Sequence, residues 1–250
     1  VFIPGVWGPY HSAMVPGVWL SEGGQSGAGA AIAQLLSLHP ASPAARREAE
    51  AAGRSLPDHL AQAAEARIGS PSEAVHLAGS LIVVPDFLGN RSPHADPAAR
   101  AVIAGWGMEG DFEHLVSLYV AGVLGIGYGL RQILVASAAQ GAVVEAIVLS
   151  GGAGRHRLVR QLLADASGLP LLAPEGADPV LVGAAMLGAA AAGAFADLGA
   201  AMRGMAGAAS VFRPEQRVGA AHAARFAAFE TMQAAARRAR DFIETEGAAR

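Results

Sequence analysis

Residues 146–165 determine the fold class of this chain more than any other segment does. The apolar run Ala146–Leu149 leads into the pair Gly151 and Gly152, and a helical pattern follows as far as Asp165. A buried strand, a glycine turn and a helix in this order form the building unit of α/β folds. The segment therefore predicts an α/β protein.

The same turn allows two interpretations. Glycine lets a ligand lie against bare backbone, and the start of the following helix offers unpaired N–H groups with a partial positive charge. Together these features form a site of the size and polarity of a nucleotide. The alternative is a plain strand-to-helix turn, which many α/β proteins have without any ligand, and the turn alone does not decide between the two.

A second strand–glycine–helix unit lies near the start of the chain. The loop Ser21–Gly29 is rich in glycine, and a helical pattern begins at Ala30. One interpretation is a flexible turn in which Ser26 caps the helix. The other is a loop whose N–H groups face a phosphate, while Glu22 or Gln25 holds a hydroxyl group.

The remaining segments predict one domain over residues 1–250 with strands of mixed direction. Residues 1–20 predict a β-hairpin that turns at Gly8–Pro9, with Trp7 and Trp19 in the core or in a wall. Residues 41–75 are punctuated by proline and predict a helical excursion on the surface. The further elements are a strand at 81–84, a long glycine-containing helix at 111–136 that implies close neighbouring helices, a short edge strand at 169–172, and helices at 179–194, 197–205 and 214–246.

Composition excludes several kinds of chemistry. All 18 basic residues are arginine, so the chain lacks the lysine of a Walker-type phosphate loop and of Schiff-base catalysis. It has no cysteine, which excludes disulfides, thiolate nucleophiles and cysteine-ligated metals. The net charge is −3 and no long basic run is present, so we expect neither nucleic acid nor a membrane as a partner. The longest apolar stretch, 180–196, is broken by glycine and predicts a buried helix, and without a visible signal peptide we expect a cytoplasmic protein.

Four motifs carry a resemblance to a known family. They are Pro16–Ser26, Gly89–Pro97, Tyr128–Arg131, and Ser150–Ala153 with its companions at 164–168 and 181–185. In this order along the chain they resemble the motifs of the FGGY carbohydrate kinases, and most of all those of the ribulokinase branch. The motifs span residues 1–195 and are specific as a set, although each alone is weak.

The resemblance implies an actin-like, ribonuclease-H-like ATPase domain, the C-terminal half of a two-domain sugar kinase. It implies MgATP as the phosphoryl donor and a pentulose such as ribulose, or a polyol such as ribitol, as the acceptor. The family's N-terminal domain supplies the catalytic aspartate and most sugar contacts, and this chain has no counterpart to it. We therefore expect no catalytic residue and no metal ligand here, an N-terminal kinase domain as partner, and no activity for this chain alone.

Individual positions carry over from the family motifs. The resemblance assigns Gly151, Gly152 and Ala153 to the adenine and ribose of ATP, and Gly29 to its phosphates. Glu22 matches a ribulokinase position that reaches the sugar. All five are predictions that depend on the family match rather than on spacing alone.

One position departs from the family pattern. The family usually has asparagine close to the adenine where this chain has His156. A lost neutral hydrogen bond is worth about 0.5–1.5 kcal/mol, so we expect weaker ATP binding rather than its loss. Arg91 and Asp165 match recurrent family positions that we interpret as structural.

Three interpretations of the function stay open at this point. In the first, the chain is the ATP-binding part of an active kinase. In the second, it is a truncated, catalytically incompetent nucleotide-binding module. In a third interpretation there is no ligand, and the glycines serve only to pack an alanine-rich core. The sequence also leaves open whether the protein is a homo-oligomer.

Overall fold

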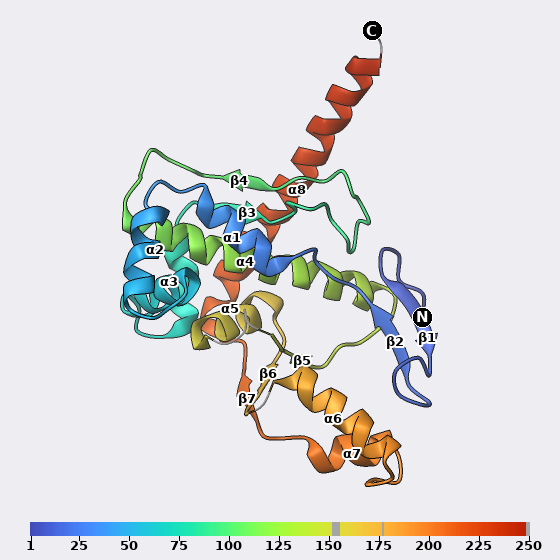
Figure 1. The fold of residues 1–250 in the computed structure, drawn as a ribbon. Helices are drawn as coiled ribbons and strands as arrows, with labels where there is room; N and C mark the ends of the chain where they lie inside the picture. Colours follow the sequence, from blue (N-terminus) through green and yellow to red (C-terminus); the bar gives the residue numbers. More distant parts are fainter. Residues whose placement is uncertain (152–155, 177, 249–250) are drawn as a thin grey trace.

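The computed structural model describes residues 1–151, 156–176 and 178–248 of the chain and shows a mixed α/β protein (Figure 1). Its helices are α1 (Ala28–Ser37), α2 (Ser42–Ala51), α3 (Leu56–Glu65), the 3-10 helix η1 (Pro71–Ala78), α4 (Phe112–Ala139), α5 (Arg157–Ser167), α6 (Pro179–Ala191), α7 (Leu198–Met205), the 3-10 helix η3 (Gln216–Val218) and α8 (Gly219–Ala248). Its strands are β1 (Trp7–His11), β2 (Trp19–Glu22), β3 (Ile82–Val84), β4 (Val102–Ala104), β5 (Ile147–Val148), β6 (Leu171–Pro174) and β7 (Ala209–Phe212).

Helix α4 lies at the centre of the fold, with α1 and β3 on one side and α5 on the other (Figure 1). It begins at the expected place because the carboxylate of Asp111 accepts a hydrogen bond from the N–H of His114 at 2.8 Å and so caps the first turn. The helix is long and apolar enough to cross a membrane, but 67% of its most apolar window is buried inside the protein. That burial is typical of the core helix of a globular domain.

The glycines of α4 let its neighbours approach closely. A Cβ atom on Gly122 would lie 2.6 Å from a leucine side chain of α1, and one on Gly127 would lie 2.6 Å from Ala166 of α5. The prediction of close neighbouring helices is therefore confirmed at these two positions. At Gly125 the neighbour is a strand instead, because a Cβ atom there would lie 2.3 Å from the carbonyl oxygen of Val83 in β3.

The strands form three small sheets of mixed direction, as predicted. The pairs β1–β2 and β3–β4 are antiparallel, whereas in the third sheet β6 has β5 parallel on one side and β7 antiparallel on the other. Because β6 lies in the middle of this sheet, the prediction of an edge strand at 169–172 is wrong. Its second partner, β7, is too short, and too rich in small and polar residues, to be recognised from sequence.

The predicted hairpin of β1 and β2 is present, but its turn lies elsewhere. The expected turn Gly8–Pro9 is inside β1, and the chain reverses between Ser12 and Val18, where the N–H of Ser12 donates to the Val18 carbonyl at 2.9 Å. Trp7 and Trp19 are 44% and 64% exposed, so their expected place in the core is wrong. The hairpin lies at one end of the molecule, beyond the packed helices (Figure 1).

Two helical segments differ from the expected burial. Residues 41–75 form α2, α3 and the start of η1, and Leu60 and Ala64 of α3 are fully buried in the cluster around α4, so this segment contributes to the core. Helix α6, in contrast, has no buried residue, and its Leu181 is 69% exposed. The prediction of a buried helix at 180–196 is therefore wrong for the part of the chain that the structure describes.

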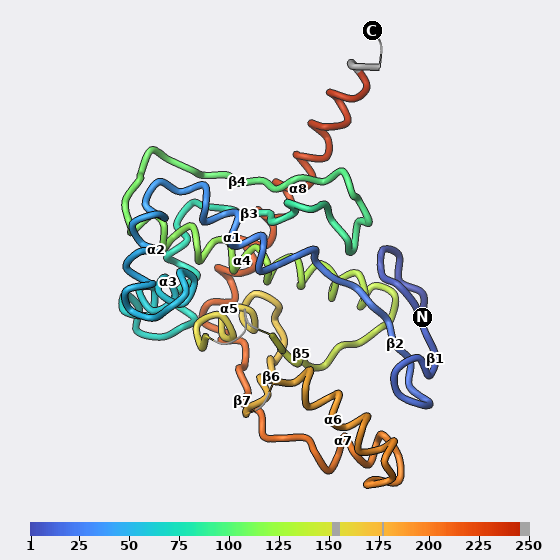
Figure 2. Tube along the Cα trace, in the orientation of Figure 1, coloured from blue at the N-terminus to red at the C-terminus, as the bar shows by residue number. Residues whose placement is uncertain are grey.

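The last helix, α8, starts a few residues later than the predicted 214–246, because the 3-10 turn η3 comes first. Its first half packs against β3, α5 and α4. Its last turns extend away from the rest of the protein toward the C-terminus (Figure 2), and Phe242 and Ile243 are more than two-thirds exposed there.

Candidate functional site

A cavity with a volume of about 430 Å³ lies between four helices of the fold. Its lining residues are Ala28, Gly29 and Ile32 from α1, Ser55, Pro57 and Asp58 from the start of α3, Tyr119, Val123 and Ile126 from α4, and His156, Val159 and Leu163 from α5 and its N-cap. The walls are mainly apolar, with few polar groups, as is usual for a small-molecule site.

One end of the cavity is the N-terminus of α1. Gly27 caps this helix with φ 63° and has no side chain that could accept a hydrogen bond, so the first N–H groups of the helix have no side-chain partner among the described residues. The loop before the helix is held in place because the Gln25 amide donates to the carbonyl of Ile126 at 2.8 Å. A Cβ atom on Gly29 would have no neighbour within 4 Å, so the first turn of α1 borders open space.

His156 forms part of the opposite wall and caps α5. Its Nδ1 accepts a hydrogen bond from the N–H of Leu158 at 3.2 Å. The proton of the neutral ring is therefore on Nε2, which lies 3.7 Å from a carboxylate oxygen of Glu65. His156 thus takes the capping role that asparagine would have, and it keeps one N–H donor at the border of the cavity.

Sequence reasoning missed the residues that α3 and α4 contribute. Ser55 caps α3, its hydroxyl accepting from the N–H of Asp58 at 3.2 Å and donating to the Asp58 carboxylate at 2.6 Å. Tyr119, only 3% exposed, borders the same end of the cavity, and its pKa is raised by burial and additionally by the charge of Asp58. The pattern Ser-x-x-Asp indicates the start of a helix. The pattern does not indicate that this helix start lies near α4 and α5.

The structure places the other predicted nucleotide residues as follows. Gly151 lies three residues after β5, is exposed, and is not among the residues that line this cavity; its φ of 95° is a conformation that favours glycine. Gly152 and Ala153 lie outside the described residues, so their assignment stays a prediction. Gly29 and His156, which come from two separate predicted segments, line the same cavity.

Glu22, the predicted sugar contact, does not line this cavity. It lies at the end of β2 and accepts a hydrogen bond from the Arg91 guanidinium at 2.8 Å. That guanidinium also stacks on the indole of Trp7, 4.0 Å from the ring centre. Arg91 therefore joins the loop 85–97 to the hairpin, in agreement with a structural role.

Asp165 also has a structural position. Its carboxylate is 6% exposed and accepts hydrogen bonds from the N–H of Glu215, at 2.8 Å, and from the Gln161 amide, at 2.9 Å. Burial raises its pKa, and these hydrogen bonds partly offset that effect. The contacts join α5 to the segment that precedes α8.

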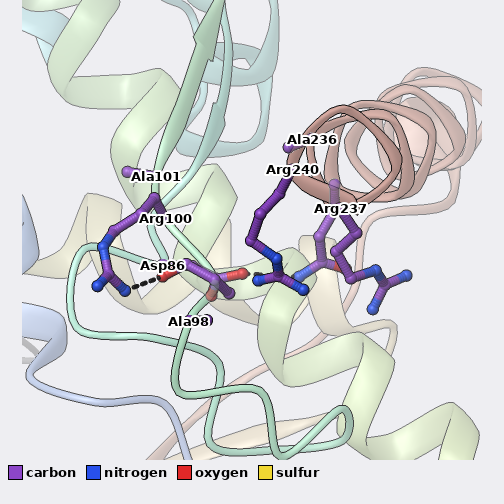
Figure 3. Close-up of a pocket in the computed structure, with 9 residues that line it drawn as sticks. Asp86, Ala98, Arg100, Ala101, Ala236, Arg237 and Arg240 are labelled. Atoms are coloured by element: carbon purple, nitrogen blue, oxygen red, sulfur yellow. Dashed lines mark hydrogen bonds between the residues drawn. The ribbon is translucent and has the colours of Figure 1, made fainter. Parts of the chain in front are cut away.

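A second, smaller cavity of about 160 Å³ lies where α8 crosses the loop after β3 (Figure 3). Arg100, Arg237 and Arg240 surround the buried carboxylate of Asp86, which accepts from Gln233 of α8 at 2.9 Å. Burial raises the pKa of Asp86, while the hydrogen-bonding amides lower it. Arg240 is in turn paired with an aspartate of the loop at 2.9 Å. These opposite charges compensate one another, so we interpret the cavity as the attachment of α8 to the loop.

Residues 1–192 match the FGGY family of carbohydrate kinases, C-terminal domain. The FGGY carbohydrate kinase domain-containing protein of Homo sapiens is 40% identical over 205 residues, which cover 82% of this chain and 37% of that protein. The D-ribulokinase of Saccharomyces cerevisiae is 38% identical over 194 residues, which cover 76% of this chain and 27% of that protein. The chain thus spans less than half the length of the curated relatives it matches.

Solved structures share the fold at low sequence identity. The xylulose kinase from Rhodospirillum rubrum superposes with a TM-score of 0.65 at 22% identity, covering 88% of this chain and 40% of that one. The glycerol kinase of Plasmodium falciparum with ADP superposes with a TM-score of 0.57 at 20% identity, covering 86% of this chain and 38% of that one. The fold confirms the predicted actin-like architecture, and the chain belongs to the FGGY family of carbohydrate kinases, matching the C-terminal domain of that family.

Proposed function

We propose that this chain is the ATP-binding part of a kinase that phosphorylates a pentulose, with ribulose as the first candidate. The observation that carries the proposal is that Gly29 and His156 line one cavity of nucleotide size. They belong to two separate motifs, which the family resemblance assigns to the phosphate end and the adenine end of ATP. The choice of ribulose rests on the name of the yeast relative.

In the proposed mechanism the adenosine lies between α3, α4 and α5, and the phosphates pass the N-terminus of α1. There the free N–H groups and the positive end of the helix dipole favour negative charge. The N-terminal half of the kinase supplies the aspartate that takes the proton of the acceptor hydroxyl, and the γ-phosphoryl group transfers in line. Closure of the two halves excludes water during the transfer.

Mg²⁺ bound together with ATP would neutralise charge in the transition state of this mechanism. Within the described ranges of this chain, no group of three histidine, aspartate or glutamate side chains is arranged to hold a metal.

Replacing Gly29 with valine tests the site directly. The new side chain would project into open space at the phosphate end, so it should fill the site without disturbing the packing. We expect the dissociation constant for ATP, measured by titration calorimetry, to rise by about tenfold, or about 1.4 kcal/mol.

Gly24→Val is the matched control, because a Cβ atom there also has no neighbour within 4 Å and the residue does not line the cavity. Equal ATP affinities for the two variants would argue against a phosphate position at Gly29.

His156→Asn is expected to tighten ATP binding by up to about tenfold, because it restores the neutral amide of the family pattern. Asparagine is a good N-cap, so α5 should keep its first turn. The ATP dissociation constants of both proteins, with thermal unfolding as a check on folding, measure this effect. Weaker binding of the asparagine variant would show that the histidine N–H is the better partner.

The alternative function is a nucleotide-binding module without catalysis. Mixing the chain with a separately expressed N-terminal half of a related kinase, and following ATP-dependent phosphorylation of ribulose, distinguishes the two. The kinase proposal expects turnover only in the mixture. ATP binding without turnover in the mixture favours the module.

The exposed apolar face of α6 supports the N-terminal domain as the partner, since the chain spans less than half of its relatives. In the intact kinase we expect the absent half to cover part of this face.

A further inference from the structure

We infer that Asp58, with Tyr119 in the same cavity, selects the base of the nucleotide by accepting a hydrogen bond from the amino group of adenine. This inference rests on the proposed ATP site and adds the residues that would distinguish adenine from 6-oxopurines. It depends on where the two side chains lie along the cavity, on which of their polar atoms have no hydrogen-bond partner, and on whether those atoms donate or accept hydrogen bonds.

The positions of the lining residues along α4 distinguish the two ends of the cavity. Ile126 lies at the α1 end, where its carbonyl binds Gln25 of the loop before α1. Tyr119 lies seven residues earlier, about 10 Å along the helix axis. Asp58 lies in the first turn of α3, which packs against α4, and it lines the same cavity as Tyr119, so we place it at this second end. Figure 1 shows α3 beside the first turns of α4 and the start of α1 over its middle.

This arrangement places the two ends of a nucleotide. The helix N-terminus at the α1 end attracts phosphate. A carboxylate at the other end repels phosphate but accepts hydrogen bonds from N–H groups. A nucleotide whose phosphates lie at α1 therefore presents its base to Asp58 and Tyr119.

The free atoms at the base end match adenine. One oxygen of the Asp58 carboxylate accepts from the Ser55 hydroxyl at 2.6 Å, and the other oxygen has no hydrogen-bond partner among the described residues. The Tyr119 hydroxyl likewise has no hydrogen-bond partner in the described part of the chain, and a protonated phenol can donate a hydrogen bond. An acceptor beside a donor complements the amino group and the ring nitrogen N1 of adenine.

Hypoxanthine and guanine present the opposite pattern at these positions. Their 6-oxo group would face the carboxylate, acceptor against acceptor, whereas their N1–H could donate to the Tyr119 oxygen. Asp58 is exposed in the free chain, and a bound base would cover its carboxylate; a polar group that a ligand covers and leaves without a partner discriminates strongly between such analogues. Asp58 is therefore the residue that we expect to reject them.

The test compares ATP with ITP, which differs from ATP in the 6-substituent and the protonation of N1. Titration calorimetry on the whole chain measures both dissociation constants for the wild type and for Asp58→Asn. The amide can present either an oxygen or an N–H, and Ser55 still accepts from the backbone of residue 58, so the cap of α3 is kept. We expect the wild type to favour ATP by about tenfold or more, and the variant to bind both within about threefold.

Glu50→Gln on the exposed face of α2 is the control of equal charge, and it should keep the wild-type ratio. Tyr119→Phe should weaken the binding of both nucleotides and leave the ratio within about threefold of the wild type, while thermal unfolding reports whether each variant is folded. Equal binding of ATP and ITP by the wild type, or an unchanged ratio in Asp58→Asn, would overturn the inference and leave the ATP site standing. Failure of the wild type to bind either nucleotide would overturn the proposed function itself, and this inference with it.

Discussion

Replacing Gly125 with alanine is expected to lower the free energy of unfolding by about 3 kcal/mol or more. Helix α4 crosses β3 at this glycine, and an added Cβ atom would lie 2.3 Å from the carbonyl oxygen of Val83 and 3.2 Å from its carbonyl carbon. Both atoms are backbone, so no rotamer change relieves the overlap. Either the strand or the helix must move, and α4 is the element on which the core is built.

Gly188→Ala is the control for this effect. It is also a helix-interior glycine, in α6, but a Cβ atom there would meet nothing within 4 Å. Alanine is the better helix former, so this variant should gain up to about 1 kcal/mol. Urea unfolding followed by circular dichroism measures both changes. A Gly125→Ala protein as stable as the wild type would mean that α4 and β3 are not in contact as described.

The glycines of α4 also show what sequence predicts well and what it does not. Their number in one helix implied close packing, and the long periodic pattern gave the helix its position at 111–136, close to the observed Phe112–Ala139. The identity of each neighbour was not readable, because contacts between distant segments leave no local pattern. The same limit explains why the second partner of β6 and the exposure of α6 were missed.

Some residues of the candidate site could be predicted from the sequence, and others could not. Gly29 and His156 were predicted from motifs of the family, and the cavity brings them together. Asp58 and Tyr119 were not predicted as site residues. Asp58 is an exposed acidic residue in a proline-punctuated segment, which is typical of a solvated surface, and Tyr119 is a buried residue of the long helix α4. Their position depends on α3 packing against α4, which is a property of the fold. The role of Glu22 in sugar binding stays a prediction.

The buried His222 is expected to make the protein less stable as the pH falls below neutrality. It is 1% exposed, and its Nδ1 lies 3.2 Å from the hydroxyl of Tyr128, while its Nε2 has no partner among the described residues. Burial lowers the pKa of His222 to about 4, and the positive charges of Arg131 and Arg225 act in the same direction, as does the nearby His76.

The sign of the effect follows from which state binds the proton. The unfolded chain takes up a proton near pH 6.5, whereas the folded protein does so only near pH 4. Between these values acid favours the unfolded state, so the stability contributed by the neutral imidazole is lost as the pH falls through this window. A shift of this size corresponds to about 3 kcal/mol.

A double variant, Tyr128→Phe with His222→Leu, isolates this contribution because it removes the titrating ring and leaves no buried hydroxyl without a partner. Urea unfolding at about pH 7 and about pH 4 should show a loss of stability about 3 kcal/mol smaller in the variant than in the wild type. His39 and His94, whose pKa values are also lowered mainly by burial, are present in both proteins and cancel in this difference. Equal losses in the two proteins would mean that His222 is accessible to protons in the folded state, and that α8 does not seal this side of α4.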